Sequence, residues 1–143
     1  MKELIGDLWE FHGVAIICIT TNGYVTGKGE AVFGRGCARQ SQLRFPGIRL
    51  RLGNMLATVG NHVHWLGDGV VSFPVEESPW SNPDLRLIRR SAEELRKMAD
   101  IEGWDHVVVP RPGCGGGGLM WEEVRPLLLE VFDDRFTVIS ACP

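Results

Sequence analysis

The chain has 143 residues, 44% of them hydrophobic and 23% charged, a composition that fits one globular domain spanning residues 1–143. The formal net charge is −3, which excludes a general positive field for bulk nucleic-acid binding. No apolar run reaches membrane-spanning length and the N-terminus lacks a signal-peptide pattern, so we expect a cytoplasmic protein with no membrane contact.

The first stretch of the chain predicts two strands. Leu4–Ile5 begin an apolar segment that stops at Gly6, and Asp7 follows directly. This aspartate either caps a turn or accepts a hydrogen bond from a ligand amino group, and the sequence leaves both interpretations open. The continuous apolar run from Val14 to Ile19 predicts a buried central strand.

A first glycine-rich loop follows this strand, from Thr20 to Ala38. It matches neither a Walker A loop nor the complete dinucleotide fingerprint. Asn22 either forms an Asn–Gly turn or binds a ribose hydroxyl. Lys28 is either solvated or placed to contact phosphate.

The middle of the chain alternates helical and strand patterns. Asn82, Pro83 and Asp84 predict a helix start with Asn82 as the N-cap. We expect Pro126 to kink the last helix or to separate its first turn. The expected elements are helices over 37–44, about 50–59, 83–99 and 121–131, a hairpin over 62–73 turning at Asp68–Gly69, and a strand over 136–140.

A second glycine-rich loop connects the Val107–Val109 strand to the helix that begins at Trp121. Glycine lets a ligand approach the backbone without a Cβ in the way. A strand, a bare loop and a helix in that order present free N–H groups to an anion. Pro110 and Pro112 stiffen the approach, which favours a shaped loop over a flexible connection.

The four cysteines form no CxxC pair and have no histidine at zinc spacing, so we predict reduced thiols, no metal site and no cofactor. His62 and His64 share a strand face but lack a recognisable third ligand. Strands separated by helices predict an α/β sandwich with a largely parallel sheet, and both glycine-rich loops then lie on its ligand-binding side. Such loops suit a phosphate-bearing molecule with hydroxyls, such as a nucleotide sugar.

Five segments, taken together and in order, resemble the macrodomain family, whose members bind ADP-ribose. They are Gly6–Asp7–Leu8, Thr21–Asn22–Gly23, Gly34–Arg35–Gly36–Cys37–Ala38, Ser72–Phe73–Pro74 and Pro112–Trp121. Within the family the chain looks most like the branch that contains terminal ADP-ribose protein glycohydrolase and antitoxins that remove ADP-ribose from DNA. The resemblance implies a three-layer α/β/α sandwich with a mixed, largely parallel central sheet.

The resemblance also implies a set of ADP-ribose-binding residues. Asp7 and the Leu8 N–H would read adenine, the loop around Asn22 and Gly34–Ala38 would hold the distal ribose, and Cys114–Leu119 would wrap the diphosphate. The implied set is Asp7, Leu8, Thr21, Asn22, Gly34, Arg35, Gly36, Cys37, Ala38, Pro74, Cys114, Gly115, Gly116, Gly117, Gly118 and Leu119.

The chain departs from this branch at the residues that carry chemistry. Glu76 stands where the hydrolases tend to carry a nucleophilic lysine, and Gly117 and Met120 stand where related proteins have acids. A carboxylate cannot form a Schiff base, although Glu76 would serve as a general base toward water. We therefore expect a protein that binds ADP-ribose or an ADP-ribosylated protein or nucleic acid, with no strong binding to unmodified nucleic acid.

Two alternatives remain open. One is an ADP-ribosyl glycohydrolase that uses Glu76 or another base as its catalytic residue. The other is a dinucleotide-dependent oxidoreductase, which the incomplete glycine fingerprint disfavours. The sequence leaves the oligomeric state undetermined.

Overall fold

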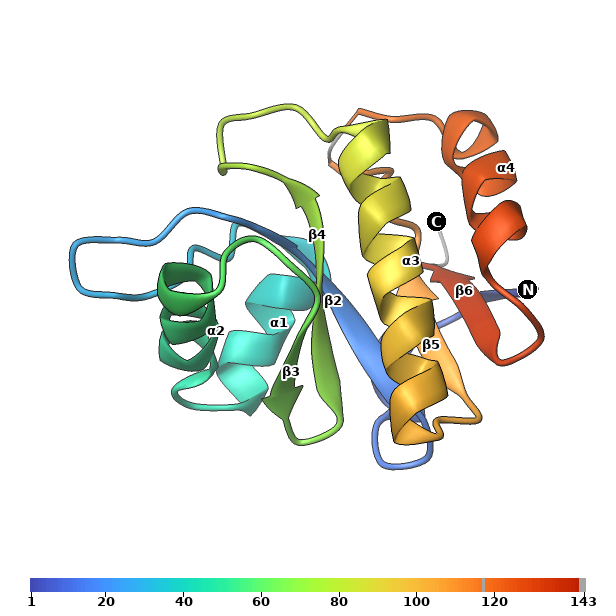
Figure 1. Cartoon of the computed structure of the whole chain (residues 1–143), viewed down its shortest axis with the longest axis horizontal. Coiled ribbons are helices and arrows are strands. Elements are labelled where there is room, and N and C mark those ends of the chain that lie inside the picture. The colour runs from blue at the N-terminus through green and yellow to red at the C-terminus, as the bar shows by residue number, and fades with distance from the viewer. Residues whose placement is uncertain (117, 142–143) are drawn as a thin grey trace.

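The computed structural model describes residues 1–116 and 118–141, and its centre is one six-stranded sheet (Figure 1). The strand order is β1-β6-β5-β2-β4-β3. All neighbouring strands run parallel except β3 and β4, which are antiparallel, so the sheet is mixed and largely parallel as predicted. The strands are β1 (Lys2–Ile5), β2 (Ile16–Asn22), β3 (His64–Gly67), β4 (Val70–Glu76), β5 (Val107–Pro110) and β6 (Phe136–Ser140).

Helices cover both faces of the sheet. Alternate β2 side chains enter different cores: Cys18 packs with the residues of α3 and α4, while Ile17 and Ile19 pack with those of α1 and α2. This arrangement confirms the three-layer α/β/α sandwich. The helices are the short 3₁₀ helix η1 (Leu8–Phe11), α1 (Gly36–Arg44), α2 (Ile48–Thr58), α3 (Leu85–Glu102) and α4 (Trp121–Val131).

Two predicted boundaries are wrong. The central strand begins at Ile16 rather than Val14, because the chain turns at Gly13 with φ +92° and leaves the Val14 side chain 76% exposed. The N-cap of α3 is Asp84 rather than Asn82. The Asp84 backbone is still extended, and its carboxylate accepts a hydrogen bond from the Arg86 N–H at 2.8 Å.

The other local predictions concern turns and prolines. The hairpin between β3 and β4 is confirmed, with positive φ at both Asp68 and Gly69. The last helix runs from Trp121 to Val131, and Pro126 lies inside it rather than separating its first turn. None of the helices within the described residues is long and apolar enough to cross a membrane.

Candidate functional site

A cleft of about 1190 Å³ lies where the parallel strands end. The chain first builds the sheet from β2 toward β4, and α3 then carries it back to β5 on the other side of β2. Ligands of open α/β sheets bind at such a change of direction, outside the carboxyl ends of the strands. The cleft is large enough for a molecule of nucleotide size.

The cleft brings most of the predicted site residues together. Pro74 is not among its lining residues, because it is buried within β4, where its carbonyl accepts a hydrogen bond from Ser91 Oγ at 2.7 Å. Gly118 and Leu119 also lie outside the lining, and Gly117 is outside the described residues. The predicted residues that line the cleft are Asp7, Leu8, Thr21, Asn22, Gly34, Arg35, Gly36, Cys37, Ala38, Glu76, Cys114, Gly115 and Gly116.

Asp7 lies in the lining just after β1, and its side chain is exposed. Its carboxylate accepts a hydrogen bond from the Trp9 N–H at 3.0 Å and so caps η1. The turn-capping interpretation is therefore confirmed. A carboxylate has lone pairs to spare after one such bond, so a contact between Asp7 and a ligand amino group stays a prediction.

Asn22 fixes the shape of the 23–35 loop, which connects β2 to α1. Its Nδ2 donates a hydrogen bond to the Val32 carbonyl at 3.0 Å, and its Oδ1 accepts one from the Tyr24 N–H at 3.0 Å. Both ends of the amide therefore hold the protein's own backbone. Each end keeps capacity for one further hydrogen bond toward the cleft.

Thr21 lies beside Asn22 and is 4% exposed. Its hydroxyl oxygen is buried and has no hydrogen-bond partner within the described residues. A buried polar atom without a partner is unfavourable. Other atoms of Thr21 line the cleft.

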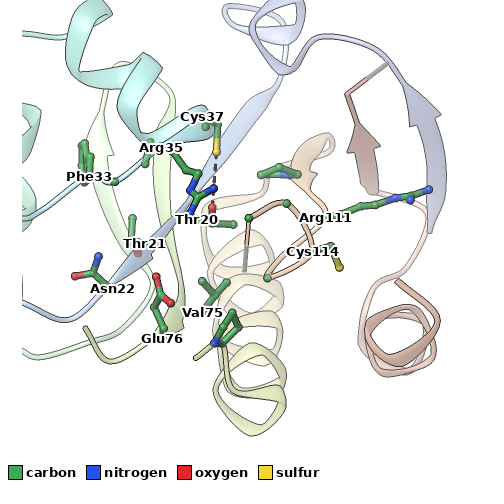
Figure 2. Close-up of a pocket in the computed structure, with 18 of the residues that line it drawn as sticks. Thr20, Thr21, Asn22, Phe33, Arg35, Cys37, Val75, Glu76, Arg111 and Cys114 are labelled. Atoms are coloured by element: carbon green, nitrogen blue, oxygen red, sulfur yellow. Dashed lines mark hydrogen bonds between the residues drawn. The ribbon is translucent and has the colours of Figure 1, made fainter. Parts of the chain in front are cut away.

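The first turn of α1 forms one wall of the cleft (Figure 2). No side chain caps this helix, and the first N–H groups of a helix have no acceptor within it. Gly36 adopts φ +69°, which glycine tolerates at no steric cost. The Cys37 thiol lies 3.8 Å from the Thr20 hydroxyl, and burial raises the pKa of this thiol.

The opposite wall is the 111–120 loop, which connects β5 to α4. Gly113 is buried with φ +75°, and a Cβ there would lie 2.9 Å from Leu119 Cδ1. The Leu119 N–H donates to the Gly113 carbonyl at 3.1 Å and closes the loop. Gly115 and Gly116 are exposed on the cleft side. The loop is therefore shaped around Gly113 and presents bare backbone to the cleft.

Glu76 ends β4 directly beside Asn22 of β2 and lines the cleft. Its side chain is partly buried, and this desolvation raises the pKa of the carboxyl. The Glu76 carbonyl accepts a hydrogen bond from Asn61 Nδ2 at 3.1 Å. A carboxyl whose pKa moves toward neutrality is suited to general-base chemistry.

Several residues in or beside the cleft were not predicted from the sequence. Asn61 lies outside the lining and supports Glu76 through a contact that no motif indicates, because it joins positions 15 residues apart. Arg111 was detectable in principle, since it directly follows β5 at the same edge of the sheet. The missed lining residues are Gly6, Thr20, Val32, Phe33, Gln40, Val75, Pro79, Ser81, Asn82, Pro83, Pro110, Arg111, Gly113, Ile139, Ser140 and Ala141.

The three layers, the strand order and the position of the cleft define the class of fold. This class is the macrodomain fold. No family model matches the sequence, and no curated protein matches it. The macrodomain of Mycobacterium tuberculosis DarG superposes with a TM-score of 0.77 at 22% identity, over 100% of this chain and 99% of that one. The macrodomain of Thermus aquaticus DarG gives 0.76 at 19% identity, over 99% and 97% of the two chains.

A third similar structure is Thermosipho africanus DarTG in complex with ADP-ribose. It matches with a TM-score of 0.77 at 18% identity, over 99% of this chain and 42% of that one. The macrodomain fold expected from the resemblance is therefore confirmed.

Proposed function

We propose that this protein binds ADP-ribose in the cleft, as one domain in the cytoplasm. The observation that carries the proposal is the pair of bare-backbone walls: the uncapped first turn of α1 on one side and Gly115–Gly116 on the other. Backbone N–H groups at a helix start and in a glycine loop bind phosphate oxygens. The similar structure of Thermosipho africanus DarTG, which is a complex with ADP-ribose, adds support.

Each part of ADP-ribose is assigned to one region of the cleft. We assign the adenine to the region of Asp7 and Leu8, and the diphosphate to the space between the two glycine-rich walls. The distal ribose then falls beside Asn22 and Glu76, which are neighbours in the sheet. Leu119 closes the second loop from outside the lining through its bond to the Gly113 carbonyl, Gly118 precedes it, and Pro74 lies buried within β4.

Of the two activities, binding of ADP-ribose and its removal from a macromolecule, we favour binding. Glu76 cannot form the Schiff base that a lysine forms, so removal of ADP-ribose from a macromolecule is slow or absent. The second candidate is a glycohydrolase in which Glu76 activates water. One specific observation favours it, namely the raised pKa of the Glu76 carboxyl.

The ligand is free ADP-ribose, or ADP-ribose attached to a protein or nucleic acid. The net charge of −3 gives no general attraction for phosphate backbones, so unmodified DNA does not bind strongly at physiological salt. Submicromolar affinity for unmodified duplex DNA would contradict this part of the proposal.

Calorimetric titration with ADP-ribose, AMP and NAD tests the binding function. The proposal predicts that ADP-ribose binds more tightly than AMP or NAD. The absence of both heat and a thermal shift with millimolar ADP-ribose would refute the proposal. Tighter binding of NAD than of ADP-ribose would instead favour the oxidoreductase alternative.

Incubation with ADP-ribosylated protein and ADP-ribosylated DNA separates binder from hydrolase. The binder proposal predicts no appreciable release of ADP-ribose by the natural protein and measurable release by Glu76→Lys. If the natural protein releases ADP-ribose and Glu76→Gln stops the release, the binder proposal fails and Glu76 is a general base. The loss of a general base typically costs about 10²–10⁴ in rate, a difference that the assay resolves.

A further inference from the structure

The Arg35 side chain spans the cleft. Arg35 is the N-cap residue of α1, its backbone is extended, and its side chain makes no capping hydrogen bond. Figure 2 shows it directed from the start of α1 into the space between β2 and the opposite loop. A Cβ built on Gly116 would lie 2.5 Å from Arg35 Nη1, 2.6 Å from Cζ and 2.8 Å from Nε. The guanidinium therefore lies against the bare Cα of Gly116 on the far wall.

Within residues 1–116 and 118–141 this guanidinium has no hydrogen-bond acceptor. Among the hydrogen bonds and ion pairs of residues 1–116 and 118–141, none involves the Arg35 side chain, whereas Arg51 pairs with Asp68 and Arg125 pairs with Glu3. From residue 31 to residue 67 the chain carries five arginines and no acidic residue, so no nearby sequence neighbour neutralises Arg35. As far as the described residues go, its donors are unpaired where Arg35 meets Gly116 of the opposite wall.

The other cation among the described lining residues, Arg111, is stacked on an aromatic side chain. The Arg111 guanidinium lies over the Trp121 ring, 4.6 Å from its centroid. The acidic residues of the lining are Asp7, which follows β1, and Glu76, which ends β4, and these two strands do not adjoin each other. Of these two cations, Arg35 is therefore the one whose side chain reaches from one wall to the other.

We propose that Arg35 clamps the diphosphate of the bound ligand, so that a side-chain cation adds to the backbone N–H groups of the two walls. This inference rests on the proposed function. The planar guanidinium presents paired N–H donors that match two phosphate oxygens. Because Arg35 starts on one wall and rests on the other, it closes over an anion held between them. It is thus a specificity-determining residue for ligands with two adjacent phosphates.

The test compares Arg35→Ala with Arg39→Ala. Arg39 is exposed on the same helix, one turn further on, and lies outside the cleft lining, so its replacement removes an equal charge. Calorimetric titration uses ADP-ribose and AMP, and NMR titration uses inorganic pyrophosphate and inorganic phosphate. We expect Arg35→Ala to weaken ADP-ribose binding about tenfold to a hundredfold, as loss of a charged hydrogen bond does, and to weaken AMP binding less. Arg39→Ala should change ADP-ribose binding less than threefold.

Two further variants test the geometry. Arg35→Lys keeps the charge without the planar fork, and it should bind ADP-ribose more weakly than the natural protein but more tightly than Arg35→Ala. Gly116→Ala displaces the Arg35 guanidinium from its position. The effect of Gly116→Ala on ADP-ribose affinity should therefore be smaller in the Arg35→Ala background. Equal effects of Gly116→Ala in both backgrounds would refute the reach across the cleft.

The outcomes distinguish a failure of the Arg35 clamp from a failure of the proposed ADP-ribose binding. If the natural protein binds ADP-ribose and Arg35→Ala binds it equally well, the clamp is refuted and the proposed function stands. If the natural protein binds pyrophosphate through Arg35 but does not bind ADP-ribose, the proposed function fails and the anion clamp stands. If it binds neither ligand, both are refuted. Because Arg35 is exposed and unbonded, Arg35→Ala should unfold at the temperature of the natural protein, which checks that the fold is intact.

Discussion

Gly113 is the residue on which the shape of the 111–120 loop depends, and Gly113→Ala tests that dependence. The residue has φ +75°, and an added Cβ would lie 2.9 Å from Leu119 Cδ1 and 3.1 Å from both Ile88 Cδ1 and Pro83 Cβ. The left-handed conformation costs about 1–2 kcal/mol for a residue with a Cβ. Overpacking in a filled site costs about 1–3 kcal/mol. The loss of chain entropy in the unfolded state returns about 0.4–1 kcal/mol.

The net expectation is a loss of roughly 1–4.5 kcal/mol in the free energy of unfolding, a sizeable fraction of the usual 5–15 kcal/mol for a domain. Two neighbouring glycines act as matched controls. Gly118 has φ +92° but open space around it, so Gly118→Ala should cost only about 1 kcal/mol. Gly115 has open space and no positive φ, so Gly115→Ala should lie within about 0.5 kcal/mol of the natural protein.

Urea denaturation followed by tryptophan fluorescence and by circular dichroism measures all three variants, and an unchanged m-value shows that stability alone has changed. The reasoning predicts the order Gly113→Ala, then Gly118→Ala, then Gly115→Ala in decreasing loss of stability. A Gly113→Ala protein as stable as Gly115→Ala would refute the account of the loop.

Three other predictions concern single side chains. Asn22→Ala removes both amide hydrogen bonds that shape the 23–35 loop, so it should cost about 1–3 kcal/mol in urea denaturation and weaken ADP-ribose binding in calorimetry; unchanged stability would show that the loop does not need them. The Cys37 thiol, whose pKa burial raises, should alkylate slowly with iodoacetamide at pH 7.5 and more slowly still with ADP-ribose bound, as followed by mass spectrometry; faster alkylation with ligand would contradict the site. Hydrogen bonds from Arg135 lower the pKa of Asp133 from 3.8 to about 2, so its contribution is fully present above pH 4 and is lost as the pH falls toward 2, and Asp133→Asn should flatten acid unfolding over that range; an unchanged acid transition would contradict this.

The sequence predicted the glycine-rich loops because their signals are local. Strand, glycines and helix follow one another within about twenty residues, and the parallel sheet then brings both loops to one edge. Asp68–Gly69 likewise specifies the turn between β3 and β4, because both residues adopt the positive φ that this turn requires. The layers followed from the order of strands and helices, so the main features of the fold were predictable.

The errors and omissions arise where tertiary contacts decide the outcome. Asn82, Pro83 and Asp84 all suit a helix start, and the backbone bond from the Asp84 N–H to Val75, at 2.9 Å, keeps Asp84 outside the helix as its cap. The contact of Asn61 with Glu76 joins segments separated in the sequence, and no periodicity indicates it.

The same limit applies to the cleft itself. The approach of Arg35 to Gly116 spans 81 positions of the chain and depends on how the two walls are spaced. Sequence spacing indicates which backbone is bare, but it does not indicate which side chain crosses the gap. That information comes only from the folded arrangement.

Titration of ¹⁵N-labelled protein with ADP-ribose, followed through backbone amide signals, tests the central claim most directly. The account predicts that the largest shifts fall on both walls of the cleft, at Gly36–Ala38 and at Gly115–Gly116, and near Asp7. Amides of α2 and β3, which lie away from the cleft, should move little. Shifts confined to other surfaces, or no shifts at millimolar ADP-ribose, would contradict the account.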